Sequence, residues 1–241
     1  MTWTPSAGQS GGTVRVKDRL VKKLEDYRPS RRRGATTSPH AFDPVRGVPA
    51  ARPSRPAAGV RADDGVYPVL RGTVPVVMTD AAVLVPIILH EDEITVLLTQ
   101  RAAHLPDHAS QISFPGGRIG AADARPEDAA LREAEEEVGL ARAGVEVIGR
   151  LDLYETGTGF SITPVVGLIA PPVALTPDPL EVADIFEVPL SFVTDPRNHK
   201  RHSAIFNGVE RHFWALPFED RYIWGATAGM LVNLSEVLNG D

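Results

Sequence analysis

Apolar residues along this chain follow different spacings, and each spacing predicts a type of secondary structure. Residues 81–89, AAVLVPIIL, form a continuous apolar run of the kind found in strands that are buried on both faces. A polar turn at 90–93 separates this run from a second one at 94–100, so the two are expected to pair as a hairpin. Residues 145–156 alternate between apolar and polar positions, which indicates a half-buried strand.

Further strands are expected in the second half of the chain. Residues 161–170 supply one strand, and residues 181–190 look like a strand that enters a short helix. The segments that flank Asn207-Gly208 are expected to form another hairpin, because this dipeptide favours a two-residue turn.

Two segments carry a helical spacing of apolar residues, at 126–138 and 226–238. The first also has the expected end signals, with Pro126 in its first turn and Gly139 at a left-handed stop. A strand-rich chain with two main helices predicts an α/β sandwich in which helices cover a mixed sheet.

The N-terminal segment differs from the rest in charge and composition. Residues 1–62 hold 13 lysines and arginines against 4 acids, whereas the remaining residues hold 12 against 27. Apolar positions at helical spacing predict a short amphipathic helix over 14–27. Residues 27–56 are rich in Arg, Pro, Ser and Ala and cannot bury enough apolar surface to fold alone, so an extended strap or a flexible leader is expected there. A nucleic-acid partner is not expected, because aromatic residues are not interleaved with the basic ones.

Composition narrows the class of protein further. A chain of 241 residues with 43% hydrophobic content can bury one good core. It contains no cysteine, so disulfides are excluded and any metal must be bound by oxygen or histidine. No apolar run approaches the roughly 20 residues of a membrane helix, and no signal peptide is recognised at the N-terminus. We expect a soluble protein of the cytoplasm that has no membrane partner.

The predicted helix at 126–138 places three carboxylates, those of Glu133, Glu136 and Glu137, on one face. Like charges at these spacings cost a few tenths of a kcal/mol per pair, roughly the reverse of what opposite charges gain, so helix stability does not require them. Clustered carboxylates suit Mg²⁺ or Mn²⁺. The alternative is a solvated acidic face that binds nothing.

The string around these acids resembles the Nudix box, G-x(5)-E-x(7)-R-E-U-x-E-E-x-G-U, where U is aliphatic. Residues 132–140, REAEEEVGL, match every fixed position of its second half. In the first half, Gly117 lies one residue farther from Arg132 than the pattern requires, and the nearest acid is Asp123. An extra loop residue explains the difference, and the role of this acid is left unassigned.

Upstream, the chain is similar to the signature of the coenzyme A diphosphatase branch of the Nudix hydrolases, L-L-T-x-R-[SA]-x(3)-R-x(3)-G-x(3)-F-P-G-G. Pro106 stands in place of its second arginine and Ser110 in place of its first glycine. The matching residues are Leu97, Leu98, Thr99, Arg101, Ala102, Phe114, Pro115, Gly116 and Gly117.

The resemblance implies a Nudix-type α/β/α sandwich with a mixed sheet at 67–241, preceded by a basic N-terminal arm at 1–66. It also implies metal-dependent hydrolysis of a diphosphate bond, with Mg²⁺ or Mn²⁺ as cofactor. By the same resemblance, Glu133 and Glu137 are expected as direct metal ligands. Glu136 is expected as a ligand or a water-mediated partner, and the Gly116 carbonyl is a further candidate.

The resemblance assigns the catalytic residues as Glu136, Glu137 and Arg132, with Arg132 holding a carboxylate in a bidentate orientation. The alternative for Arg132 is an ordinary surface pair with Glu136 or Asp128. The general base is left open between a box glutamate and a later acid, Glu155 or Glu181.

Substrate contacts are expected from Arg101, His104, Phe114 and Arg118. Arg101 and His104 precede the Pro-Gly-Gly turn, where a cationic residue could contact the phosphates of the substrate. Pro106 removes one potential phosphate contact, which Arg118 or the basic arm could supply.

The leading hypothesis is hydrolysis of coenzyme A or acyl-coenzyme A to 3′,5′-ADP and the (acyl-)4′-phosphopantetheine portion. A second enzyme hypothesis is hydrolysis of ADP-ribose or a dinucleotide. A third, from another class, is a non-catalytic Nudix domain that senses a nucleotide. A homo-oligomer is compatible with the sequence.

Overall fold

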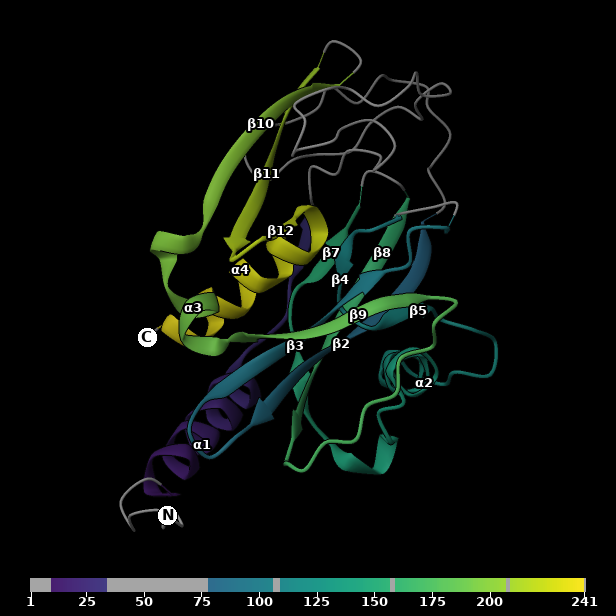
Figure 1. Cartoon of the computed structure of the whole chain (residues 1–241). Coiled ribbons are helices and arrows are strands. Elements are labelled where there is room, and N and C mark those ends of the chain that lie inside the picture. The colour runs from purple at the N-terminus through teal and green to yellow at the C-terminus, as the bar shows by residue number, and fades with distance from the viewer. Residues whose placement is uncertain (1–9, 34–77, 106–108, 157–158, 207–208, 241) are drawn as a thin grey trace.

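A computed structural model describes residues 10–33, 78–105, 109–156, 159–206 and 209–240. Its largest feature is a mixed sheet of nine strands, with the order β1-β7-β8-β2-β3-β4 and with β5, β6 and β9 paired to β2, β8 and β3 (Figure 1). The strands are β1 (Arg31–Arg33), β2 (Thr79–Leu89), β3 (Ile94–Arg101), β4 (Ile112–Ser113), β5 (Gly116–Arg118), β6 (Val145–Arg150), β7 (Leu153–Glu155), β8 (Phe160–Ile169) and β9 (Val182–Pro189).

The centre of this sheet explains the continuous apolar run of β2. Strand β2 pairs antiparallel with β3, which confirms the predicted hairpin, and parallel with β8. Side chains of β2 point alternately to two faces, so Leu84 and Ile88 belong to one hydrophobic core and Val85 and Ile87 to the other. All four are fully buried. A strand with helices on both sides has no polar face, which is why its sequence does not alternate.

Helices cover both faces of the sheet (Figure 1). Helix α2 (Pro126–Val138) lies on one face, and α1 (Ser10–Asp26), α3 (Leu190–Thr194) and α4 (Gly225–Asn239) pack into the core on the other. Two 3₁₀ turns, at Arg142–Gly144 and Pro196–Asn198, complete the helical elements that the structure describes. The predicted α/β sandwich with a mixed sheet is confirmed.

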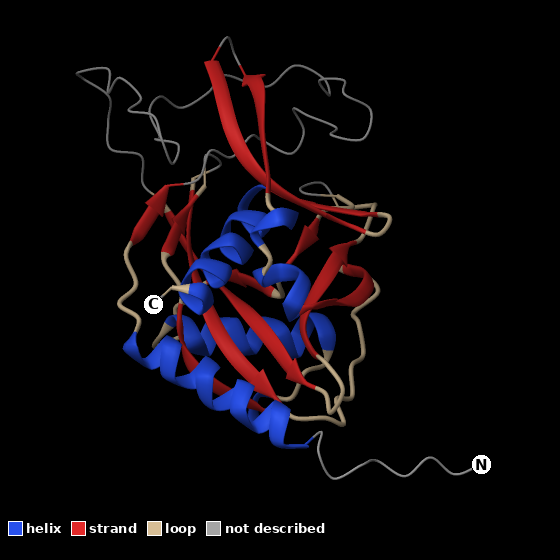
Figure 2. Cartoon of the chain, turned by 90° about the vertical axis from the view of Figure 1, so that its left-hand side faces the viewer, coloured by secondary structure: helices blue, strands red, loops and turns tan. Residues whose placement is uncertain are grey.

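A second sheet of three antiparallel strands follows α3. Its strands are β10 (Lys200–Phe206), β11 (Val209–Phe218) and β12 (Arg221–Trp224). Strands β10 and β11 form the predicted hairpin and project from the body (Figure 2). Leu216 and Ile223 of this sheet are fully buried in the core that contains α4.

Helix α1 packs onto the body of the protein (Figure 2). It contains residues 14–26 of the predicted helix 14–27, begins earlier, at Ser10, and ends one residue sooner, at Asp26. Leu20 and Leu24 are each 3% exposed and join the core of the α4 face. The predicted boundary between residues 66 and 67 lies outside the described residues.

The predicted strand 145–156 is divided into β6 and β7 in the structure. The break falls at Asp152, whose buried carboxylate accepts hydrogen bonds from the Tyr27 hydroxyl and the Ser30 backbone, both at 2.6 Å. The Asp152 backbone N–H donates to Asn233 of α4 at 2.9 Å. This polar network lies at the break and joins three distant segments. In the described part of the chain, no helix is long and apolar enough to cross a membrane.

Candidate active site

Helix α2 carries the three predicted carboxylates and is fixed at both ends. Asp128 accepts a hydrogen bond from the Arg125 backbone N–H at 3.0 Å in the first turn. Gly139 adopts φ of 69° directly after the helix, which confirms the predicted left-handed stop. Small buried residues, including Ala130 and Ala134, pack α2 against the sheet. The helix therefore approaches the sheet closely and brings its acids toward β5.

Glu137 points into the protein and is only 4% exposed. Its carboxylate accepts a hydrogen bond from the Gly116 backbone N–H at 3.2 Å and lies 3.7 Å from the Arg101 guanidinium. Burial raises the pKa of Glu137 to about 7, and the nearby Glu181 and Glu133 carboxylates add to this effect. A carboxylate in this setting gains from a nearby cation, because a cation offsets the cost of burying its charge.

At both glycines of β5, a side chain would be too close to its neighbours unless they moved. A Cβ atom on Gly116 would lie 2.5 Å from the Ala82 carbonyl oxygen. A Cβ atom on Gly117 would lie 2.5 Å from the Glu133 carboxyl group. The Phe-Pro-Gly-Gly turn thus lets β5 pair with β2 while the Glu137 carboxylate accepts from the Gly116 N–H and the Glu133 carboxyl group occupies the space beside Gly117.

Arg132 connects the acids of the helix to the loop before it. Its guanidinium donates to Glu133 at 2.8 Å and to Glu136 at 3.0 Å. It also donates to both carboxylate oxygens of Asp123, at 2.9 and 3.2 Å, and to the Arg118 carbonyl at 3.2 Å. Arg132 makes more contacts than the surface pair considered as its alternative, and it orients two of the three glutamates.

Asp123 is the acid whose role the sequence left unassigned. It lies in the loop that is one residue longer than the pattern, and the hydrogen bond from Arg132 lowers its pKa, with a further contribution from the Gly120 N–H. The bidentate pair with Arg132 holds the loop against the helix. Its signal in the sequence was its position as the nearest acid to the expected glutamate.

A cavity of about 310 Å³ opens beside the two glycines. Four residues of the predicted signature line it, Arg101, Phe114, Gly116 and Gly117, together with the predicted substrate contact Arg118. Phe114 is nearly fully buried, so it forms part of the cavity floor rather than an exposed contact. The Arg118 guanidinium lies over the Phe160 ring, 5.6 Å from its centroid. Two cations and apolar walls thus share one cavity, which suits an anionic ligand with a flat or apolar part.

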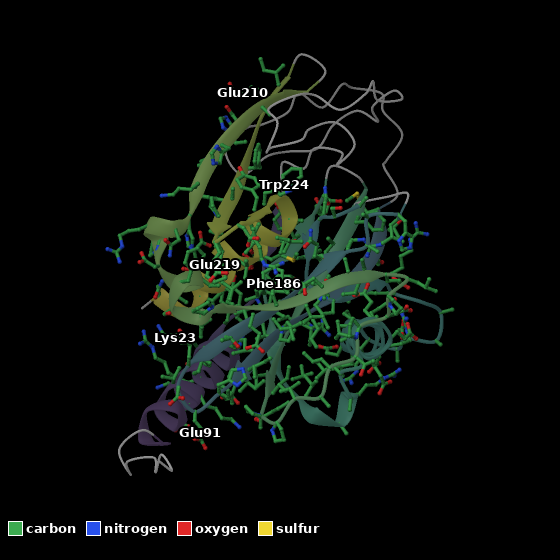
Figure 3. The ribbon with its side chains drawn as sticks, in the orientation of Figure 1. Lys23, Glu91, Phe186, Glu210, Glu219 and Trp224 are labelled. Atoms are coloured by element: carbon green, nitrogen blue, oxygen red, sulfur yellow. The ribbon has the colours of Figure 1, made fainter. Side chains whose placement is uncertain are left out.

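Several wall residues were missed by the sequence analysis because they come from distant segments. Thr156, Phe160 and Ile162 come from the end of β7 and from β8. Trp224, at the base of the three-stranded sheet (Figure 3), and Thr227 come from the junction of β12 and α4. Their spacing along the chain did not predict that they share a cavity.

Two other predicted residues, His104 and Glu155, are described by the structure but do not line the cavity. His104 is exposed and does not line it. Glu155 is buried within β7, and its neighbour Thr156 lines the cavity in its place. Pro106 lies outside the described residues. Ser110, which replaces the signature glycine, adopts φ of 60°, a conformation that favours glycine.

Glu133, Glu137 and the Gly116 carbonyl are the groups that could hold a divalent cation. The oxygen donors have the right chemistry, and the buried Glu137 carboxylate faces the Arg101 guanidinium at 3.7 Å without a hydrogen bond between them. Among the described residues, no three acidic or histidine side chains already converge as a metal site. The side chain of Glu136 is 58% exposed and is held by Arg132, which fits a water-mediated contact better than a direct one.

Comparison with known proteins identifies the family. The model of the NUDIX domain matches residues 78–205. The Nudix hydrolase NudL of Escherichia coli, described as uncharacterized, is 40% identical over 155 residues, which cover 64% of this chain and 80% of that protein. This chain therefore belongs to the Nudix family and is a Nudix hydrolase. Enzymes of this family generally use divalent metal ions.

Solved structures of the family are also similar to this chain. A NUDIX hydrolase from Alicyclobacillus acidocaldarius is 16% identical, with a TM-score of 0.42 over 69% of this chain and 95% of that one. The NUDIX domain of Shewanella oneidensis NrtR, solved with ADP ribose, is 21% identical, with a TM-score of 0.38 over 48% of this chain and 75% of that one.

Proposed function

We propose that this Nudix hydrolase cleaves the diphosphate bond of coenzyme A or acyl-coenzyme A, with Mg²⁺ or Mn²⁺ as cofactor. The observation that carries the proposal is that Arg101, Phe114, Gly116 and Gly117, all from the coenzyme A signature, line one cavity. The products are 3′,5′-ADP and the (acyl-)4′-phosphopantetheine portion. A chain without cysteine suits a reducing cytoplasm, where we propose that it acts.

Glu133 and Glu137 are the proposed direct metal ligands, with the Gly116 carbonyl beside them and Glu136 acting through water. The bound cation supplies charge neutralisation of the diphosphate and activation of the attacking water. Arg132 keeps Glu133 and Glu136 in place through its hydrogen bonds at 2.8 and 3.0 Å.

The general base is proposed among the acids whose charges act on Glu137. Glu181 lies near enough to raise the pKa of Glu137, whereas Glu155 is buried within β7. This favours Glu181, or a box glutamate, over Glu155. Arg101 and Arg118 line the cavity and supply positive charge for the phosphates.

A substrate panel tests the proposal. We expect coenzyme A and acetyl-coenzyme A to have the highest kcat/KM in a set that also contains dephospho-coenzyme A, ADP-ribose and NADH. A large loss on removing the 3′-phosphate would support coenzyme A recognition despite Pro106. Faster turnover of ADP-ribose or NADH would replace coenzyme A with the second enzyme hypothesis.

A pair of matched substitutions on α2 distinguishes a hydrolase from a nucleotide sensor. Glu137→Gln is expected to lower kcat by about 100-fold or more, because the neutral amide is a poor ligand for a hard cation. Glu135→Gln makes the same chemical change on an exposed side chain that pairs with Arg142, and it should retain activity. Nucleotide binding without turnover in the wild-type protein and in both variants would favour the sensor.

A further inference from the structure

Arg101 is positioned by an irregularity at the end of β3. The register of the β3–β9 pair shifts between Gln100 and Arg101, and such a bulge redirects the side chain that follows it. The Arg101 side chain is 26% exposed and lines the cavity. Its Nε atom is buried and makes no hydrogen bond to any residue that the structure describes. The guanidinium therefore has capacity for another partner.

The acidic neighbour of Arg101 is Glu137. The Nη1 atom lies 3.7 Å from the Glu137 Oε1 atom, which is too long for a hydrogen bond but close enough for a strong charge interaction. Within the described chain, this is the ion pair recorded for Glu137, and its carboxylate is almost fully buried. Arg101 thus supplies the positive charge that partly offsets burial of this carboxylate.

We propose that Arg101 is the counter-ion of Glu137 that a divalent cation displaces, and that its guanidinium then binds a phosphate group of the substrate. The inference rests on the proposed role of Glu137 as a metal ligand, and adds a coupling between metal and substrate. A divalent cation bound to Glu137 would repel the Arg101 guanidinium, because both are positively charged and both would lie at the same carboxylate. Arg101 lines the cavity, so a phosphate there provides a new partner for its guanidinium.

This arrangement predicts opposite effects on two binding equilibria. Removing the Arg101 charge removes a competitor for Glu137, so Mn²⁺ should bind more tightly, by roughly tenfold. The same change removes a charged hydrogen-bond donor, so a diphosphate ligand should bind about tenfold to hundredfold more weakly in the presence of metal. Damage to the fold would instead weaken the binding of Mn²⁺ and of the diphosphate ligand together.

The experiment compares Arg101→Gln with the wild-type protein. Mn²⁺ binding without nucleotide is followed by electron paramagnetic resonance in oxygen-free buffer at about pH 8, the same for every variant, because ligand carboxylates must be deprotonated to bind a metal. Binding of α,β-methylene-ADP in Mn²⁺ is followed by calorimetry. This probe carries the diphosphate that coenzyme A and ADP-ribose share, so the result does not depend on which of them is the substrate.

Arg118→Gln is the matched control, because Arg118 lines the same cavity but lies over the Phe160 ring and has no ion pair in the described part of the chain. It should leave Mn²⁺ affinity unchanged while it weakens the nucleotide analogue. A second variant, Arg101→Lys, retains the charge and should bind Mn²⁺ like the wild type even if Arg101→Gln folds poorly.

Three results would overturn the inference. The first is an Arg101→Gln variant that is folded and binds Mn²⁺ no more tightly than Arg118→Gln. The second is an Arg101→Lys variant whose Mn²⁺ affinity rises to the level expected for the glutamine variant. Failure of wild-type protein to bind Mn²⁺ at all would overturn the metal assignment of the proposed function, and the inference with it.

Discussion

Gly116 and Gly117 are adjacent, yet the side chain that each lacks would meet a different kind of obstacle. At Gly116 the obstacle is backbone, the Ala82 carbonyl oxygen at 2.5 Å. At Gly117 it is the far end of the Glu133 side chain, also at 2.5 Å. Backbone in a central strand cannot move without disturbing the sheet, whereas a side chain can rotate. The two positions therefore separate stability from activity.

We predict that Gly116→Ala lowers the free energy of unfolding by about 1–3 kcal/mol, because the added methyl group overpacks the sheet. Gly117→Ala should change it by less than about 1 kcal/mol but lower kcat/KM by about tenfold or more, because the Glu133 carboxylate is displaced. Urea unfolding measures the free energy of unfolding, and steady-state kinetics measures kcat/KM. Gly144→Ala, with nothing within 4 Å of the new methyl group, is the control. Equal stability losses at 116 and 117 would contradict the distinction.

At the scale of elements, an ion pair joins the first turn of α2 to β6. Arg150 donates to both carboxylate oxygens of Glu127, at 2.6 and 2.7 Å. The hydrogen bond from Arg150 is the main cause of a lowered Glu127 pKa. A lowered pKa in the folded state means that the interaction stabilises the fold when the carboxyl group is ionised. The pair is partly exposed, so its contribution is modest.

Glu127→Gln is expected to lower the free energy of unfolding at pH 7 by about 0.5–1 kcal/mol. The stabilisation is fully present above the unfolded pKa, near 4.5, and disappears as the pH falls through the lower folded pKa. The difference between variant and wild type should therefore shrink with acidification, as measured by urea unfolding across pH. Glu146→Gln, in a more exposed pair with Lys17, should stay within about 0.5 kcal/mol of wild type. A difference that is independent of pH would rule out the ion pair as its cause.

At the scale of the whole molecule, the N-terminal helix shares a core with the C-terminal helix. Leu20 and Leu24 of α1 belong to the same hydrophobic cluster as Leu231 and Leu234 of α4. The Tyr27 hydroxyl accepts from Asn233 at 3.4 Å and donates to Asp152, which ties α1 to the break between β6 and β7. Helix α4 also contributes residues to the cavity, so α1 supports the element that closes one of its sides.

We predict that Leu24→Ala lowers the free energy of unfolding of the full chain by about 2–4 kcal/mol, because it leaves a cavity in this shared core. The unfolding transition should remain single, since α1 unfolds with the body. Val16→Ala, at a position that is 39% exposed on the same helix, should change stability by less than about 0.5 kcal/mol. An unchanged midpoint for Leu24→Ala would show that α1 contributes little to the core.

Local patterns were enough to predict the elements and the helix that carries the acids. The apolar run of β2, the hairpin with β3 and the glycine stop at Gly139 depend on residues close in the chain, so periodicity and end signals revealed them. The division of 145–156 was missed, because it depends on Asp152 binding Tyr27 and Ser30, more than a hundred residues away.

By itself, the sequence determined which residues share the α2 face and which motifs flank it, since both follow from spacing along the chain. Only the tertiary structure decided that Arg101 faces Glu137, that Asp123 holds Arg132 and that Trp224 and Phe160 line one cavity. The physical reason is that these contacts depend on strand order and on the packing of α4. Neither strand order nor the packing of α4 leaves a periodic signal in the sequence around the residues that come into contact.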